Sequence, residues 1–150
     1  FFIDTFNFFL YDGLRHCENP VLAGIAEKSV KEIAYQAQWS AEWVIRLGDG
    51  TEESHEKVQK SVNDLWMWTG ELFEKHPVFE KLGSSFIDFS TLKTEWLEKV
   101  TLVLETATLQ IPDPESWMQT GGRLGVHTSH LGFILAEMQS LPRTYPAASW

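Results

Sequence analysis

The sequence has little positive charge, one cysteine and no long hydrophobic run. Twelve Lys and Arg residues stand against 21 Asp and Glu residues, which gives a net charge of −9. A protein that binds a phosphate backbone needs clustered Lys and Arg, and this chain has no basic run. The longest apolar run, Phe6 to Tyr11, is interrupted by Asn7 and is far shorter than the roughly 20 residues that span a bilayer. We therefore expect neither a nucleic-acid nor a membrane partner.

The single Cys17 cannot form an internal disulfide, which is typical of proteins in a reducing compartment. We therefore expect a cytoplasmic protein. The chain begins Phe-Phe-Ile without Met, so we also expect a piece of a longer protein. No strand-like alternation, repeat or low-complexity tract occurs, and 43% hydrophobic residues suffice for one core. These features predict an all-α fold and a single helical domain over residues 1–150.

The clearest predicted element is a long helix from Asn19 to Leu47. Asn19 is a preferred capping residue, and Pro20 suits the first helical position, where its missing N–H breaks no bond. The sequence Gly48-Asp49-Gly50 predicts the end of this helix. Apolar and small residues recur at steps of three and four, as a buried face requires. These residues are Leu22, Ala26, Val30, Ile33, Ala37, Ser40, Val44 and Leu47.

Apolar spacing predicts further helices on both sides of this one. The aromatic-rich segment Phe1 to Leu14 is expected to be buried on nearly all sides and to end near Gly13. Later helices are expected from Thr51 to about Lys75, from Ser90 to about Gln110, and from Thr128 to Pro142, with an irregular connector from Pro77 to Ser90. The inward residues of the helix that starts near Ser90 are Leu92, Trp96, Val100, Val103 and Ala107.

Ile33 and Gln36 have the i, i+3 spacing at which di-iron bundle proteins place Glu and His on an inner helix face. Ile has no lone pair and an amide has no formal charge, so neither is a competent iron ligand. Spacing alone favours a simpler interpretation, in which Ile33 is a core residue and Gln36 is a hydrogen-bonded amide at the core edge. Asp12 follows an apolar run, and either a solvent-facing or a buried, paired role is open for it.

Three other patterns have weak functional signals. Glu52 and His55 form the one Glu-x-x-His, but a solvated first helical turn is the favoured interpretation. The loop from Gly121 to Gly125 has the composition of an anion site with Arg123, although a structural turn is favoured because no strand precedes it. His127 and His130 are three positions apart without a third ligand nearby, so we interpret them as ordinary histidines.

Several stretches resemble the PaaC subunit family of bacterial phenylacetyl-CoA 1,2-epoxidase, a multicomponent oxygenase. They are residues 31–35 (Lys-Glu-Ile-Ala-Tyr), 46–51 (Arg-Leu-Gly-Asp-Gly-Thr), 65–73, 120–128 (Thr-Gly-Gly-Arg-Leu-Gly-Val-His-Thr) and 135–139. The resemblance covers the chain essentially from end to end and about the last three fifths of a family member. It implies a partial ferritin-like helical bundle that lacks the family's first helices.

The resemblance also implies a function in phenylacetate degradation. In the catalytic PaaA-type subunit, Asp/Glu and Glu-x-x-His ligands hold a di-iron centre. By the resemblance, Asp12 matches an acidic ligand position, and Ile33 and Gln36 match the Glu and His positions. The implied protein is a non-catalytic subunit with no cofactor of its own, which holds the catalytic di-iron subunit in shape within a homo- or hetero-oligomer. Arg123 and His127 are candidate contacts to CoA or to another subunit.

Two alternative functions stay open at this point. One is a di-iron oxygenase or ferritin-like metal protein in its own right, with Asp12 and residues outside this chain as ligands. The other is a generic helical adaptor that is unrelated to oxygen chemistry. The first requires carboxylate and imidazole ligands on facing helices, and a second Glu-x-x-His is absent from this sequence.

Overall fold

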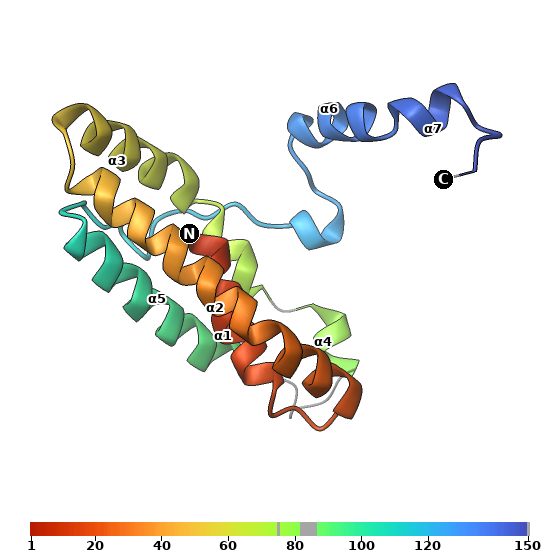
Figure 1. The fold of residues 1–150 in the computed structure, drawn as a ribbon, viewed down its shortest axis with the longest axis horizontal. Helices are drawn as coiled ribbons and strands as arrows, with labels where there is room; N and C mark the ends of the chain where they lie inside the picture. Colours follow the sequence, from red (N-terminus) through yellow and green to blue (C-terminus); the bar gives the residue numbers. More distant parts are fainter. Residues whose placement is uncertain (75, 82–86, 150) are drawn as a thin grey trace. The chain divides into compact units, whose positions relative to one another are not determined.

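The computed structural model describes residues 1–74, 76–81 and 87–149, and all regular elements in these residues are helices (Figure 1). They are α1 (Phe2–Leu14), α2 (Pro20–Gly48), α3 (Glu52–Trp66), η1 (Thr69–Phe73), α4 (Pro77–Lys81), α5 (Phe89–Thr106), η2 (Gly122–Leu124), α6 (Ser129–Met138) and α7 (Ser140–Thr144). The predicted all-α class is confirmed. The contacts divide the chain into two compact units, Phe1–Gln119 and Thr120–Trp150. The single domain over residues 1–150 stays a prediction.

The bounds of α2 follow from local signals in the sequence. The Asn19 side chain accepts hydrogen bonds from the backbone N–H groups of Val21 (3.0 Å) and Leu22 (3.2 Å), which otherwise have no partner at a helix start. Pro20 occupies the first helical position, and the helix ends at Gly48. The prediction of this helix is confirmed at both ends.

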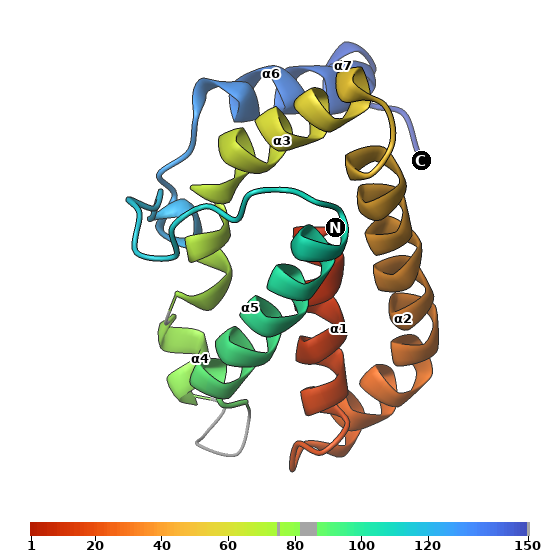
Figure 2. The same ribbon diagram turned by 90° about the vertical axis from the view of Figure 1, so that its left-hand side faces the viewer.

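In the first unit, α2 packs against α1, α3 and α5, and α1 also packs against α5. Figure 2 shows α2 along one edge of these helices, with α1 and α5 on its inner side. The core lies between them, and α5 with its C-cap Ala107 supplies much of it: all five residues predicted to face inward are buried. The main buried cluster consists of Phe6, Val62, Trp66, Leu92, Trp96, Val100, Leu104, Ala107 and Leu109.

Trp96 is the centre of an aromatic cluster within this core. Only 2% of it is exposed, and its indole N–H donates to the Phe2 carbonyl oxygen at 2.9 Å. The Trp96 ring centroid lies 5.9 Å from those of Phe2 and Trp66 and 5.3 Å from that of Phe73. These separations are in the favourable range for tilted and edge-on aromatic pairs. One side chain of α5 thereby joins α1, α3 and η1.

The predicted end of the helix that begins after Thr51 is wrong, because α3 ends at Trp66 rather than near Lys75, a residue outside the described part. After Trp66 the chain turns into η1, where the Thr69 hydroxyl donates to the Trp66 carbonyl oxygen at 2.9 Å. Met118 packs against this turn, and a Cβ added to Gly70 would lie 2.7 Å from its Cβ. The turn is therefore set by a segment distant in sequence, which local spacing does not reveal.

Three further expectations for the first unit need correction. The segment from Phe1 to Leu14 is not buried on all sides, since only Thr5 and Phe6 of α1 are buried and Ile3 is 61% exposed. α5 ends at Thr106, four residues before Gln110, because Thr108 adopts a positive φ of 59° that a continuing helix excludes. The expected connector from Pro77 to Ser90 contains α4, and its residues 82–86 lie outside the described part.

In the second unit, the turn η2 is bounded by two glycines in the left-handed region. Gly121 has φ 95° and Gly125 has φ 88°, a conformation that glycine adopts without steric cost. Thr128 occupies the N-cap position of α6 as predicted, without a side-chain capping bond. Pro142 does not end this helix as expected: α6 ends at Met138, and Pro142 is the third residue of α7, where its missing N–H breaks no helical bond.

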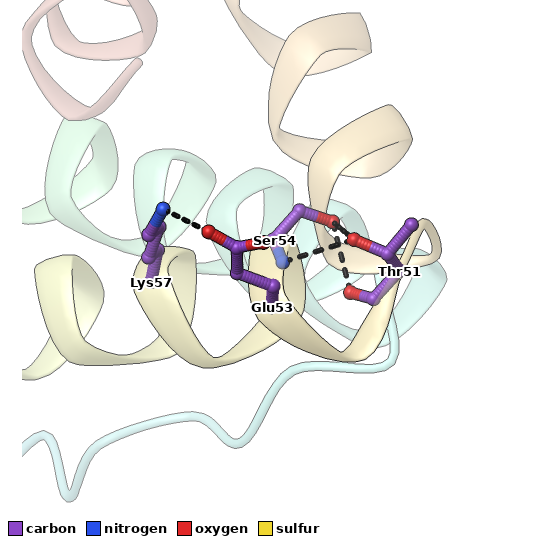
Figure 3. Close-up of polar contacts among 4 residues, drawn as sticks. All are labelled: Thr51, Glu53, Ser54 and Lys57. Carbon is purple, nitrogen blue, oxygen red and sulfur yellow. Dashed lines mark hydrogen bonds and ion pairs between the residues drawn. The ribbon is translucent and has the colours of Figure 1, made fainter.

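The corner between α2 and α3 is closely packed. Thr51 Oγ1 accepts a hydrogen bond from the Ser54 N–H at 3.2 Å, and Lys57 pairs with Glu53 at 2.5 Å (Figure 3).

At the end of α2, a Cβ added to Gly48 would lie 2.5 Å from the Ala107 carbonyl oxygen. The close approach of α2 to the end of α5 therefore requires a residue without a side chain at position 48.

This close approach makes a prediction about two glycines of the same helix. Gly48→Ala should lower the free energy of unfolding by about 1–3 kcal/mol, because the new methyl group displaces backbone that cannot move freely. Gly24→Ala is the matched control, since a Cβ there meets nothing within 4 Å, and it should raise stability by about 0.5–1 kcal/mol. Urea unfolding followed by circular dichroism measures both. Equal effects of the two substitutions would contradict the packing described.

The N-cap of α5 predicts a dependence of stability on acid. Hydrogen bonds from the hydroxyl groups of Ser90 (2.7 Å) and Thr91 (2.7 Å) hold the pKa of Asp88 at about 2, below its ordinary value of 3.8. Because the pKa is depressed in the folded state, the stabilisation is present above about pH 4 and is lost as the pH falls toward about 2. Asp88→Asn keeps a capping side chain that does not titrate.

We therefore expect the wild-type protein to lose more stability between about pH 4.5 and about pH 2 than Asp88→Asn does. Urea unfolding at the two pH values measures the difference. Asp49→Asn, at an exposed position after α2, is the control and should follow the wild-type pH dependence. Parallel pH dependence in the wild type and Asp88→Asn would show that this cap does not contribute.

Candidate functional site

Asp12 lies near the end of α1 and is paired. Its carboxylate accepts a hydrogen bond from Arg15 Nη1 at 2.8 Å, while the Asp12 side chain remains 47% exposed. Arg15 Nε also donates to Glu27 Oε2 on α2 at 2.7 Å. The bond to Glu27, with that to Asp12, raises the pKa of the Arg15 guanidinium above its ordinary value. Asp12 therefore belongs to an ion-pair network that joins the end of α1 to the start of α2.

Ile33 and Gln36 both lie on α2, but their environments differ. Ile33 is half-buried, whereas Gln36 is exposed. The prediction that Gln36 lies at the edge of the core is therefore wrong, because its side chain is exposed. A rotation of about 300° per three residues separates two such side chains by roughly 60° around the helix, which is sufficient to move one of them out of a narrow buried face.

The three positions Asp12, Ile33 and Gln36 together supply one carboxylate, one hydrocarbon and one neutral amide. Within residues 1–74, 76–81 and 87–149, no group of three or more His, Cys, Asp and Glu side chains is arranged to hold a metal ion. A di-iron centre needs several carboxylate and imidazole ligands on facing helices. The donor set at these positions does not fit such a centre.

A groove of about 500 Å³ lies between α1, α2 and α5. Its α2 wall includes three small residues, Ala34, Ala37 and Ala41, which leave space beside the larger side chains of the other helices. The exposed side chains of Glu42 and Lys99 lie at its edge, one from α2 and one from α5. This arrangement of apolar and small side chains suits an apolar occupant.

His55 of the Glu-x-x-His pattern has a structural partner. Its Nδ1 lies 2.7 Å from the Gly48 carbonyl oxygen. A carbonyl oxygen only accepts hydrogen bonds, so Nδ1 carries the proton and donates it to this bond. The expectation of a solvated first turn is therefore wrong for His55, which is half-buried, and correct for the exposed Glu52. His55 closes the α2–α3 corner, where α2 leaves a carbonyl without a helical partner.

Arg123 and His127 lie in the second unit. Arg123 is in η2 and His127 precedes the N-cap of α6, and both side chains are exposed. His130, in the first turn of α6, is exposed as well. The loop from Gly121 to Gly125 contains the 3₁₀ turn Gly122–Leu124, and the regular helix α6 begins after Thr128. An anion contact at Arg123 stays a prediction.

α2 carries a row of exposed aromatic residues that the spacing of possible metal ligands in the sequence does not indicate. Tyr35 is 68% exposed, Trp39 is 55% exposed and Trp43 is 44% exposed. They recur at steps of four, which places them on one face of the helix. The four-residue period of these aromatic residues is present in the sequence, but they are not among the residues predicted for the buried face of the helix. We call these three residues the aromatic stripe.

No helix within the described residues combines the length and the apolar character needed to cross a membrane.

In comparisons with known proteins, the family described as phenylacetic acid catabolic protein matches residues 1–150. The chain is also similar to one of the subunits of the 1,2-phenylacetyl-CoA epoxidase of Escherichia coli (strain K12), with 39% identity over 152 residues. The alignment covers 100% of this chain and 61% of the relative, so the chain spans about three fifths of that protein's length.

Proposed function

We propose, because the chain belongs to the phenylacetic acid catabolic protein family, that it is a non-catalytic subunit of a phenylacetyl-CoA epoxidase complex. The family membership and the all-α bundle place it in the ferritin-like class. The curated relative is named as a subunit of that epoxidase, which supports a role within a complex of several subunits. In the proposed complex this chain binds the catalytic subunit and stabilises its fold.

One observation carries the proposal: two of the three ligand-like positions have no metal-binding group. Ile33 offers hydrocarbon and Gln36 a neutral amide, where a di-iron helix carries Glu and His. The carboxylate of Asp12 is already paired with Arg15. The iron would therefore be held by a partner subunit of the PaaA type, and a separate reductase would supply its electrons.

The exposed apolar surface supports a role as a subunit. Large apolar patches on a soluble protein commonly mark surfaces that bind another protein. In the second unit, α6 exposes 72% of Phe133 and 72% of Met138, and in the first unit α2 exposes the aromatic stripe. A helix of ten residues is only marginally stable on its own in water, so α6 in particular requires packing partners.

A metal analysis tests the non-catalytic role. After incubation with Fe(II) in air and gel filtration, the purified chain should contain much less than one iron per molecule, because its ligand-like positions lack donors. The catalytic subunit, treated in the same way, is the positive control. About two irons per chain retained through gel filtration would contradict the proposal and favour a di-iron enzyme in its own right.

A second test concerns the candidate CoA contact. If Arg123 seats a CoA phosphate at a subunit boundary, Arg123→Ala should weaken binding of a CoA ester to the assembled complex by about 1.5–3 kcal/mol, the value of a charge-assisted hydrogen bond. Arg143→Ala is the matched control, since Arg143 is an exposed arginine of the same unit that bonds to Gln139 at 2.6 Å. Isothermal titration calorimetry measures both. Unchanged binding in an intact complex would assign the loop a structural role alone.

A further inference from the structure

The outer face of α2 carries a continuous stripe of exposed residues. Beyond the aromatic stripe it includes Glu32 toward one end and Arg46 toward the other, both of them exposed. Successive residues of an α-helix are about 100° apart, so all five lie within about 80° of one another around the helix. Figure 2 shows this helix at an edge of its unit, with the packed helices on its inner side.

The sequence of this stripe is symmetric about Trp39. Tyr35 and Trp43 each lie four positions from Trp39, and Glu32 and Arg46 each lie seven positions from it. A two-fold interface brings residue i of one copy to residue j of the other, and residue j to residue i. When two copies of α2 cross antiparallel at Trp39, each aromatic residue faces an aromatic residue and each Glu32 faces an Arg46.

We propose that this face binds a second copy of the chain in an antiparallel α2–α2 contact with Trp39 on the two-fold axis. Trp39 of one copy meets Trp39 of the other, flanked by two Tyr35–Trp43 contacts and two Glu32–Arg46 ion pairs. Trp, Tyr and Arg are the residue types that dominate the binding energy of protein interfaces. Aromatic residues in the middle with charges at the rim match the usual arrangement of such interfaces.

Charge complementarity selects this register over a neighbouring one. If the two helices slide so that Tyr35 faces Trp39, Glu32 faces Glu42 and Arg46 faces Lys28. Like charges then meet at both ends, which is unfavourable. In the symmetric register, opposite charges meet instead.

Within the described residues, neither Glu32 nor Arg46 forms a close ion pair, so both can pair with a second copy of the chain. The intrachain ion-pair contact of Arg46 is long, at 4.0 Å from Glu42, and its guanidinium lies 5.8 Å from the centre of the Trp43 ring. Among the described residues, Glu32 forms no ion pair. Glu32 and Arg46 are too far apart on one helix to pair with each other, since 14 residues span roughly 21 Å.

Substitutions at the axis test the contact by analytical ultracentrifugation of the intact protein. The wild type should be a dimer at micromolar concentration, and Trp39→Glu should raise the dimer Kd at least about 100-fold, because two carboxylates then meet on the axis. Leu102→Glu is the control: Leu102 is 57% exposed on α5, and its substitution should leave the Kd unchanged. A wild-type monomer, or a dimer that Trp39→Glu does not weaken, would overturn the proposal.

The charge pair tests the register and does not depend on the aromatic residues. Glu32→Arg and Arg46→Glu should each raise the Kd on the order of tenfold, since each creates two like-charge contacts by symmetry. An equimolar mixture of the two variants should form a heterodimer with near-wild-type Kd, because both contacts again join opposite charges. The double variant should likewise recover. Single variants that weaken the dimer without recovery in the mixture would overturn the register, and circular dichroism verifies that each variant is folded.

Discussion

Trp96 is buried at the point where the first unit brings its elements together, and the rest of that unit depends on its contacts. Its ring lies against Trp66 and Phe73, and its N–H donates to the Phe2 carbonyl oxygen in the first turn of α1. A buried indole is stable only if its N–H has a partner, so this bond fixes where α1 begins relative to α5. The aromatic contacts also join Trp66 at the end of α3 and Phe73 of η1 to α5. The position of α2 follows from α1 and α5, against which it packs.

The parts of this fold that were predictable from the sequence are those with local causes. Asn19 and Pro20 define the start of α2 whatever surrounds it, and apolar spacing defines the buried face of α5. The end of α3 at Trp66 was not predictable, because it depends on the approach of Met118 to Gly70 and on a bond from the Gln119 N–H to the Met67 carbonyl oxygen at 2.8 Å. Those partners lie some fifty positions apart in sequence. Spacing within one helix carries no information about them.

The candidate site shows the same division. The i, i+3 spacing of Ile33 and Gln36 was readable, but their interpretation as former ligand positions came from the family resemblance and not from the spacing. The bond from His55 to the Gly48 carbonyl oxygen was not predictable, because it joins two helices across a turn. The stripe around Trp39 had a clear periodic signal. Apolar spacing is used to find the buried face of a helix, so it does not identify such an exposed row. Association with another protein depends on the exposed face.

The carbonyl group of Gly48 is a point where three helices meet. It accepts a hydrogen bond from His55 at the start of α3, and the Thr108 hydroxyl beyond the end of α5 lies 3.5 Å from it. The absence of a side chain at position 48 lets this part of the chain approach so closely. A local opening of the end of α2 would break contacts with both neighbours at the same time. This corner is therefore expected to open as one cooperative unit, with slow amide hydrogen exchange across residues that are far apart in sequence.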